Sequence, residues 1–226
     1  VTAENWRDLV AARDASETYC PDEAVTERQK AIIRQAKIDK DTVGGLVEAH
    51  VFGLPPGVGS CMDWRQKLDA RIAYAVVGIQ AFKAVEIGLG RATAERLGSR
   101  VHDPIHYDGA LKNESHLGFV RSRNNAGGLE GGMTNGMPIV VTGTMKPIAT
   151  LLQGLPSVDL NTKQAEQSQY ERSDICAVSA ASVVMENAVA FEVARAALSK
   201  FGGDTLVEFK DNYERFMANA RMLPLD

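Results

Sequence analysis

The sequence predicts a fold that mixes helices and strands in a single domain spanning residues 1–226. The clearest strand covers residues 138–145 (PIVVTGTM), in which β-branched residues predominate. The clearest helix covers residues 177–201, and because that stretch is hydrophobic almost all round we expect a buried central helix. No repeat, low-complexity tract or obvious linker interrupts the chain, which favours one domain over two.

The other expected elements follow from hydrophobic spacing and turn residues. An amphipathic helix over residues 22–39, capped by Asp22, comes first. Residues 88–136 are rich in Gly, Asn, His and charges, and a stretch of that length is usually functional or mobile in a compact domain. The remaining predictions are strands at residues 46–52 and 85–87, a helix at residues 67–78, a short helical piece near residues 92–97 and an amphipathic helix at residues 205–222.

The composition is that of a soluble globular protein of 226 residues, 45% of them hydrophobic. A net charge of −4 excludes a global field for nucleic acid or an anionic membrane, so an anionic ligand needs a local cluster of cations and backbone N–H groups. The cysteines (Cys20, Cys61 and Cys176) are far apart and form no CxxC, which is typical of reduced thiols in a cytoplasm. No membrane span or signal peptide is recognisable. Because the first residue is Val1 and not Met, we expect the natural chain to start elsewhere.

Arg172 and Asp174 stand at the start of the apolar helix. Free N–H groups and a partial positive charge at a helix start favour anions and orient a carboxylate. Arg adds a planar fork of donors suited to phosphate or carboxylate, so the pair indicates an anion site with an acid/base group beside it. The alternative is structural and commoner: Ser173 or Asp174 caps the helix and Arg172 forms a surface ion pair. Both interpretations stay open on these residues alone.

Two further segments have the character of ligand-binding loops. Residues 124–136 contain five glycines and three asparagines, and Gly lets backbone N–H groups approach a ligand closely. Neither a Walker loop nor a Gly-x-Gly-x-x-Gly pattern occurs there, and a tight pair of turns is the alternative. Residues 146–150 follow the clearest strand, where Lys146, a Pro-stiffened turn and a hydroxyl could hold a phosphate or a flavin edge. A solvated Lys at a strand end is the alternative.

The remaining polar residues point to structural roles. His102 and His106 have a spacing that could chelate a metal, but they lie in a polar loop without a third ligand, so no metal site is predicted. Glu186 lies mid-way along the apolar helix and, if buried, must be paired or functional, with pairing the commoner case. The cysteines have no neighbouring base that would activate a nucleophile.

Taken together, these segments resemble chorismate synthases. The resemblance covers most of the chain from about Thr42 to Gly203, in the order of that family and without large gaps. The family's third signature is an Arg-x-Asp followed by small residues and a helix with a Glu, which residues 172–186 match. The other matching blocks are residues 41–45 (DTVGG) with 53–55 (GLP), 67–69 (KLD), 78–88 (GIQAFKAVEIG) and 124–146.

The resemblance implies an α+β fold in which antiparallel β-sheets sandwich central helices, here truncated, and a cytoplasmic homotetramer. It implies a lyase of the shikimate pathway that converts 5-enolpyruvylshikimate 3-phosphate to chorismate and phosphate by anti-1,4-elimination with reduced FMN. Whether NADPH reduces the flavin (NADP dependence) stays open. By position, Arg172 and Asp174 would be the catalytic residues, and FMN would be bound by Gln80, Ala81, Gly131, Lys146, Pro147, Ile148, Ala149, Thr150 and Arg172.

Departures from the family limit what can be carried over. Ser179 stands where the family usually has Pro, and some members have Asn where Gln80 stands. Two motifs that supply catalytic histidines and substrate-binding arginines, of the Gly-Glu-Ser-His-Gly and Gly-Arg-Ser-Ser-Ala-Arg-Glu types, do not occur here, so no catalytic His is carried over. The chain therefore resembles a C-terminal portion, and we predict that alone it turns over no substrate. The alternative is a non-catalytic remnant that binds flavin or oligomerises.

Overall fold

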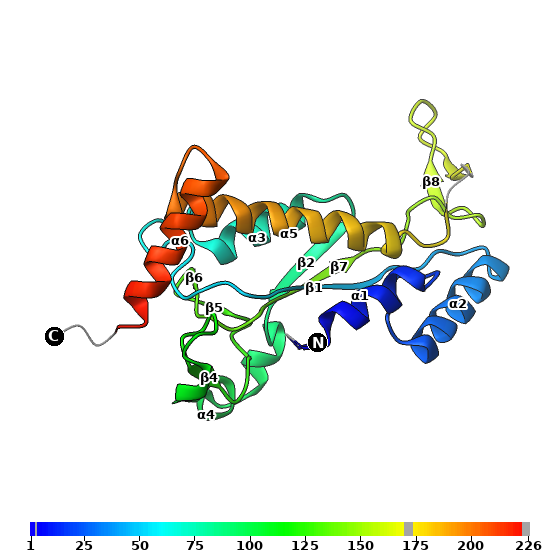
Figure 1. Cartoon of the computed structure of the whole chain (residues 1–226). Helices are drawn as coiled ribbons and strands as arrows, with labels where there is room; N and C mark the ends of the chain where they lie inside the picture. Colours follow the sequence, from blue (N-terminus) through cyan, green and yellow to red (C-terminus); the bar gives the residue numbers. More distant parts are fainter. Residues whose placement is uncertain (3, 170–173, 223–226) are drawn as a thin grey trace. The chain divides into compact units, whose positions relative to one another are not determined.

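The computed structural model describes residues 1–2, 4–169 and 174–222 (Figure 1). The chain forms two compact units, one made of Val1–Val47 with Thr144–Val183 and the other of Glu48–Gly143 with Val184–Asp226. Each unit is described by itself below, as the first and the second unit. The single-domain organisation stays a prediction.

Among its described residues, the first unit contains helices α1 and α2, a β-hairpin and the first residues of α5. Helix α2 (Glu23–Ile38) is confirmed with its cap, because the Asp22 side chain accepts a hydrogen bond of 2.9 Å from the Val25 N–H. Helix α1 (Trp6–Ala15) was not predicted; none of its residues is fully buried, and its apolar side is short. Strands β8 (Pro156–Val158) and β9 (Ala165–Gln167) pair antiparallel, and all their residues are exposed, which removes the alternation that reveals a strand.

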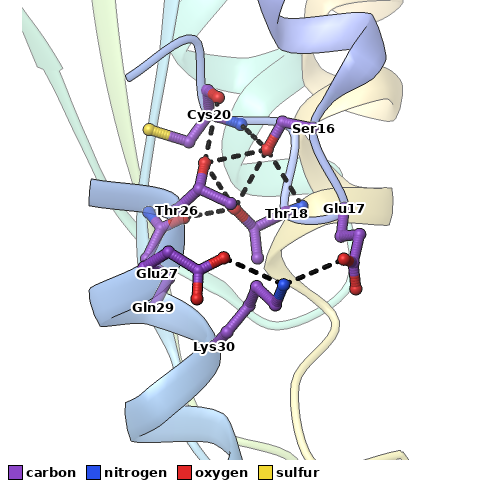
Figure 2. A network of polar contacts seen from close by, with 8 residues as sticks. All are labelled: Ser16, Glu17, Thr18, Cys20, Thr26, Glu27, Gln29 and Lys30. Carbon is purple, nitrogen blue, oxygen red and sulfur yellow. Dashed lines mark hydrogen bonds and ion pairs between the residues drawn. The ribbon is translucent and has the colours of Figure 1, made fainter. Parts of the chain in front are cut away.

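A polar network ties the turn after α1 to α2 (Figure 2). The Ser16 and Thr26 hydroxyls lie 2.9 Å apart, and the Thr26 hydroxyl donates to the Cys20 carbonyl at 3.2 Å. In the same network, the Thr18 hydroxyl in the turn donates to the side-chain carbonyl of Gln29 on α2 at 2.6 Å. Thr26 is buried, so these bonds satisfy hydroxyls that would otherwise be costly to remove from water.

Most of a three-stranded sheet belongs to the second unit; its order is β1 (Gly45–Val51), β7 (Ile139–Met145) and β2 (Phe82–Ile87), with residues 45–47 and 144–145 counted in the first unit. Helices α3 (Leu68–Gly78) and α5 (Val178–Phe201) lie along this sheet (Figure 1). Gly143 on β7 lets the layers approach closely, since a Cβ there would overlap Phe82 and come within 2.8 Å of the Met185 sulfur. The core side chains with less than 2% exposure in the second unit include Pro55, Val58, Leu68, Ile72, Val76, Ile139, Val141, Met185 and Val189.

The stretch between β2 and β7 is built from short elements and is not a plain connector. Two antiparallel pairs, β3 with β4 and β5 with β6, give it internal order. Arg123 adds to this by donating to the carbonyls of Ser99, Arg100 and His102. The elements are η1 (Gly90–Glu95), α4 (Gly98–Val101), β3 (Ile105–Tyr107), η2 (Gly109–Leu111), β4 (Phe119–Arg121), β5 (Leu129–Glu130) and β6 (Met133–Thr134).

The expectation of a helix buried all round is wrong for α5. Val184, Phe191 and Leu198 are 51%, 63% and 54% exposed. They recur every seven residues, so they form one apolar stripe along the helix. Glu186 is exposed as well. A helix that is hydrophobic on all sides could be buried on all sides. The hydrophobic pattern alone does not show which of its faces packs against the rest of the described chain.

The last helix, α6 (Leu206–Ala220), is confirmed together with a full capping box between Thr205 and Glu208. Phe201, at the end of α5, packs edge-on against the aromatic rings of Phe209 and Tyr213 on α6. Within the described part of the chain, none of the helices combines the length and the apolar character that crossing a bilayer requires.

Candidate functional site

Residues 146–150, the loop after β7, are held in the first unit by the chain segment that follows α2. The Thr42 hydroxyl donates a hydrogen bond of 2.6 Å to the carbonyl of Ile148. Lys146, Pro147 and Ala149 are exposed, whereas Ile148 and Thr150 are half-buried. The loop therefore presents the Lys146 ammonium to solvent from a backbone that is fixed at its centre.

The segment that leads into α5 contacts the other side of the same chain segment. The Val43 N–H donates to the Ile175 carbonyl at 2.9 Å, and Val43 forms a parallel bridge with Cys176. Asp174, which is exposed, comes directly before this pairing. The structure thus brings the predicted segments at Ile148 and Asp174 onto two neighbours, Thr42 and Val43.

The predicted helix start is displaced from the predicted acid. Helix α5 begins at Val178, so Asp174 lies four residues before it and does not occupy the cap position, a difference larger than the usual uncertainty of helix boundaries. Arg172 and Ser173 lie outside the described residues. Ser179, where the family usually has Pro, donates its hydroxyl to the Thr18 carbonyl at 3.0 Å and so ties the first turn of α5 to the turn after α1.

Gln80 and Ala81 form the turn between α3 and β2 in the second unit, and Gln80 is exposed. Ala81 has a φ of 69°, in the left-handed region that residues other than glycine rarely adopt. Such conformations cost about 1–3 kcal/mol and gather at ligand sites. The geometry is compatible with a backbone contact to a ligand at this turn.

We expect Ala81→Gly to stabilise the ligand-free fold by roughly 0–1 kcal/mol, because the relief of left-handed strain exceeds the entropic cost of glycine. Chemical denaturation with urea measures this change in the free energy of unfolding. Gly78→Ala is a suitable contrast, because Gly78 ends α3 without a positive φ and has open space around its Cα. A loss of stability above 1 kcal/mol in Ala81→Gly would contradict the strain argument.

The glycines of residues 124–136 divide into two kinds. Cβ atoms at Gly127 and Gly128 would overlap the backbone at Gly88 and Pro138, so these glycines serve turns of the chain itself, as the structural alternative proposed. Gly131 differs: it is exposed, has a φ of 63°, and a Cβ there would meet nothing within 4 Å. Among the five glycines of residues 124–136, Gly131 is the one with free space for a ligand beside its backbone.

His102 and His106, whose spacing could chelate a metal, lie in the stretch between β2 and β7. His102 and His106 are exposed, and among residues 1–2, 4–169 and 174–222 no group of three or more His, Cys, Asp or Glu side chains is placed to hold a metal ion. His50 instead hydrogen-bonds to Glu48, which holds the pKa of that carboxyl below its usual value.

Sequence reasoning assigned no individual role to Thr42. The residue type gave a weak indication, because the hydroxyl of a Thr just before a strand can form a hydrogen bond with backbone groups. Its partner, Ile148, lies 106 positions further along the chain. A contact of that sequence separation has no local pattern, so the structure was needed to identify it.

The fold and the site define an α+β protein in which two loops, one with a cation and the other with an acid, contact the short segment between α2 and β1. The sequence profile described as "Chorismate synthase" matches residues 4–198. The chorismate synthases of Geobacter sulfurreducens and Acidobacterium capsulatum are 52% and 45% identical to this chain over 219 and 218 residues, each covering 96% of it. A solved structure described as "Crystal Structure of Chorismate Synthase" matches with a TM-score of 0.80 at 37% identity, over 97% of this chain and 56% of that one.

This chain belongs to the chorismate synthase family. The expected family and the α+β fold class are thereby confirmed. The chain spans 55% and 56% of the length of the two relatives named above.

Proposed function

We propose that this chain forms part of a chorismate synthase, a lyase that converts 5-enolpyruvylshikimate 3-phosphate to chorismate and phosphate by anti-1,4-elimination in the presence of reduced FMN. The observation that carries the proposal is the 52% identity to the Geobacter sulfurreducens enzyme over 96% of this chain. The two loops held at Thr42 and Val43 support it, because they contain the residues that the family resemblance assigns to the flavin and the substrate.

The residues present fit a flavin phosphate and a ring system. In the first unit, Lys146 offers an exposed cation. In the second unit, taken by itself, Gly131 offers backbone with open space beside it and Ala81 holds a left-handed turn. These are the groups expected for an anionic, planar ligand that approaches the main chain. When bound, reduced FMN supplies electron density that eases the loss of the allylic phosphate.

The chain's own residues would bind the anions and move a proton. Lys146 and Arg172 neutralise phosphate and carboxylate charge, which counts most in a site that excludes water. Asp174 takes up and releases a proton through its carboxylate oxygens, so that the charge at the reacting centre stays balanced. Pro147 stiffens the loop that carries Lys146, and Ile148, Ala149 and Thr150 continue it.

The remaining parts of the proposal concern the whole protein. We propose a cytoplasmic homotetramer, with no nucleic acid or membrane as partner. The exposed apolar stripe on α5 (Val184, Phe191 and Leu198) supports the homotetramer, because further protein packed on this stripe would remove it from water. The competing function is a non-catalytic flavin-binding or oligomerising remnant of the same fold.

The experiment is a chimaera. Residues 1–226 replace the matching 55% of the Geobacter sulfurreducens chorismate synthase, and the product is expressed in bacteria that lack the enzyme. We expect growth without aromatic amino acids, and chorismate formation in an anaerobic assay with chemically reduced FMN. Supplying NADPH with oxidised FMN in the same assay decides whether the protein reduces its own flavin. Light scattering gives the oligomeric state.

The chain alone and the intact relative are the controls. We expect no chorismate from residues 1–226 alone, because the general acids of the two absent motifs are missing. A chimaera that folds by circular dichroism and binds reduced FMN without turnover would favour the non-catalytic remnant. Turnover by the isolated chain would show that the two motifs are dispensable.

A further inference from the structure

The 40–44 segment, which runs from the end of α2 to the start of β1, contacts both candidate loops of the first unit. On one side the Lys40 carbonyl accepts a hydrogen bond of 3.1 Å from the Gln153 N–H, and the Thr42 hydroxyl donates to the Ile148 carbonyl at 2.6 Å. On the other side the Val43 N–H donates to the Ile175 carbonyl at 2.9 Å. Successive residues of one short segment therefore fix the backbone of residues 148–153 and of residue 175.

The contact at Thr42 is buried on the Thr42 side and half-buried on the Ile148 side. Thr42 is 7% exposed, and its backbone N–H donates to the Asp41 carboxylate at 2.7 Å. The hydroxyl has the Ile148 carbonyl as its acceptor, and a buried hydroxyl without an acceptor would be costly. The rotamer of Thr42 and the position of the Ile148 carbonyl therefore depend on each other.

Gly44 adds a second contact of a different kind. A Cβ at Gly44 would overlap the Met145 carbonyl and lie 2.8 Å from the Pro147 nitrogen and 2.9 Å from the Lys146 carbonyl carbon. No φ in the left-handed region explains this glycine. The close approach of the two backbones explains it, because any larger residue would push residues 145–147 away.

We propose that Thr42 is a positioning residue for the flavin loop, defined as residues 146–150. Its hydroxyl fixes the Ile148 carbonyl. Gly44 lets the Lys146 backbone lie directly against the same segment. The Lys146 ammonium and the N–H groups of the loop are therefore oriented before the ligand binds. The proposal rests on the proposed function of this loop in holding FMN. It also makes the 40–44 segment the common support of the flavin loop and of the segment that contains Asp174.

The test compares four variants by amide hydrogen exchange and by FMN affinity. Thr42→Val keeps the shape and removes the hydroxyl, Thr42→Ser restores the hydroxyl, and Gly44→Ala pushes the flavin loop away. Thr26→Val is the matched control, because Thr26 is also buried in the first unit and also donates to a backbone carbonyl, that of Cys20, far from the flavin loop in sequence (Figure 2). Exchange is measured on residues 1–226, and the FMN dissociation constant on the chimaera.

In Thr42→Val we expect about tenfold faster exchange at the Gln153 N–H and across the flavin loop, and about tenfold weaker FMN binding, the size expected for one lost hydrogen bond. Thr42→Ser should stay within about twofold of the parent, Gly44→Ala should weaken FMN binding at least as much as Thr42→Val, and Thr26→Val should leave both readouts unchanged. Gly44→Ala decides the case if Thr42→Val does not fold.

Two results would overturn the proposal: unchanged exchange and FMN affinity in both Thr42→Val and Gly44→Ala, or equal weakening by Thr26→Val. A parent chimaera that binds no FMN refutes the proposed function instead. Hydrogen exchange on residues 1–226 still decides, without any ligand, whether Thr42 fixes the loop.

Discussion

Replacing Glu192 with alanine is expected to destabilise the second unit by about 3–5 kcal/mol, the cost of breaking a buried ion pair by removing one partner. Glu192 on α5 is 7% exposed. Its Oε2 accepts from the Arg71 Nε on α3 at 2.8 Å, and its Oε1 accepts from the Arg195 Nη1 at 2.9 Å. Without the carboxylate, the Arg71 side chain, which is 17% exposed, keeps its charge and loses the anion paired with it. The loss would be a large share of the 5–15 kcal/mol that stabilises an ordinary domain.

The two arginines provide the controls for this prediction. Arg195→Ala removes the partner whose side chain is 55% exposed, and we expect it to cost at most about 1 kcal/mol. The double variant Arg71→Met with Glu192→Leu removes both buried charges and should recover most of the loss. Urea denaturation followed by circular dichroism gives the three free energies. A loss below about 1 kcal/mol for Glu192→Ala would mean that water or another group replaces the carboxylate.

The burial of Glu192 was partly predictable from the spacing of residues along α5. Glu186 and Glu192 are six residues apart on one helix, and the structure exposes the first and buries the second. Met185, Val189 and Glu192 follow the i, i+4, i+7 spacing of a single helix face. The buried acid was therefore predictable from helical spacing once one face was chosen, whereas the even hydrophobicity of α5 concealed which face that was.

Elements with a strong period could be predicted, and elements without one could not. Helix α2 has an apolar side with a cap, and β7 is a run of β-branched residues, so both lie within one or two residues of their expected bounds. Helix α1 has no fully buried residue, and the β8–β9 hairpin is exposed throughout. The turn after α1 is held by the network around Thr26, and side-chain contacts of this kind leave no periodic pattern in the sequence.

In the candidate site, individual residues could be predicted from the sequence, whereas the contacts between them could not. Residues in order along the chain can be matched to a family, which is how Lys146 and Asp174 were found. The pairing of Thr42 with Ile148 and of Val43 with Ile175 joins stretches more than 100 residues apart. Contacts of this kind are decided by the tertiary fold, so no local pattern predicts them.

Asp174→Asn in the chimaera is expected to lower kcat by about 10²–10⁴-fold, the range for loss of a positioned acid/base group. Asparagine keeps the shape of the side chain and one carbonyl acceptor, but it cannot take up and release a proton near neutral pH. Because the substitution leaves the Val43–Ile175 pairing in place, we expect the FMN dissociation constant and KM to change less than threefold. A fall confined to kcat identifies an interaction made only in the transition state.

Asp8→Asn is the matched control, since Asp8 is an exposed aspartate of the first unit on α1, and it should leave kcat unchanged. If Asp174→Asn retained at least a third of the parent kcat, Asp174 would not handle the proton and the acid/base role would have to pass to another group. If instead KM and the FMN dissociation constant rose together while kcat held, Asp174 would act by binding alone. The split between these constants separates a role of Asp174 in the chemical step from a role in binding.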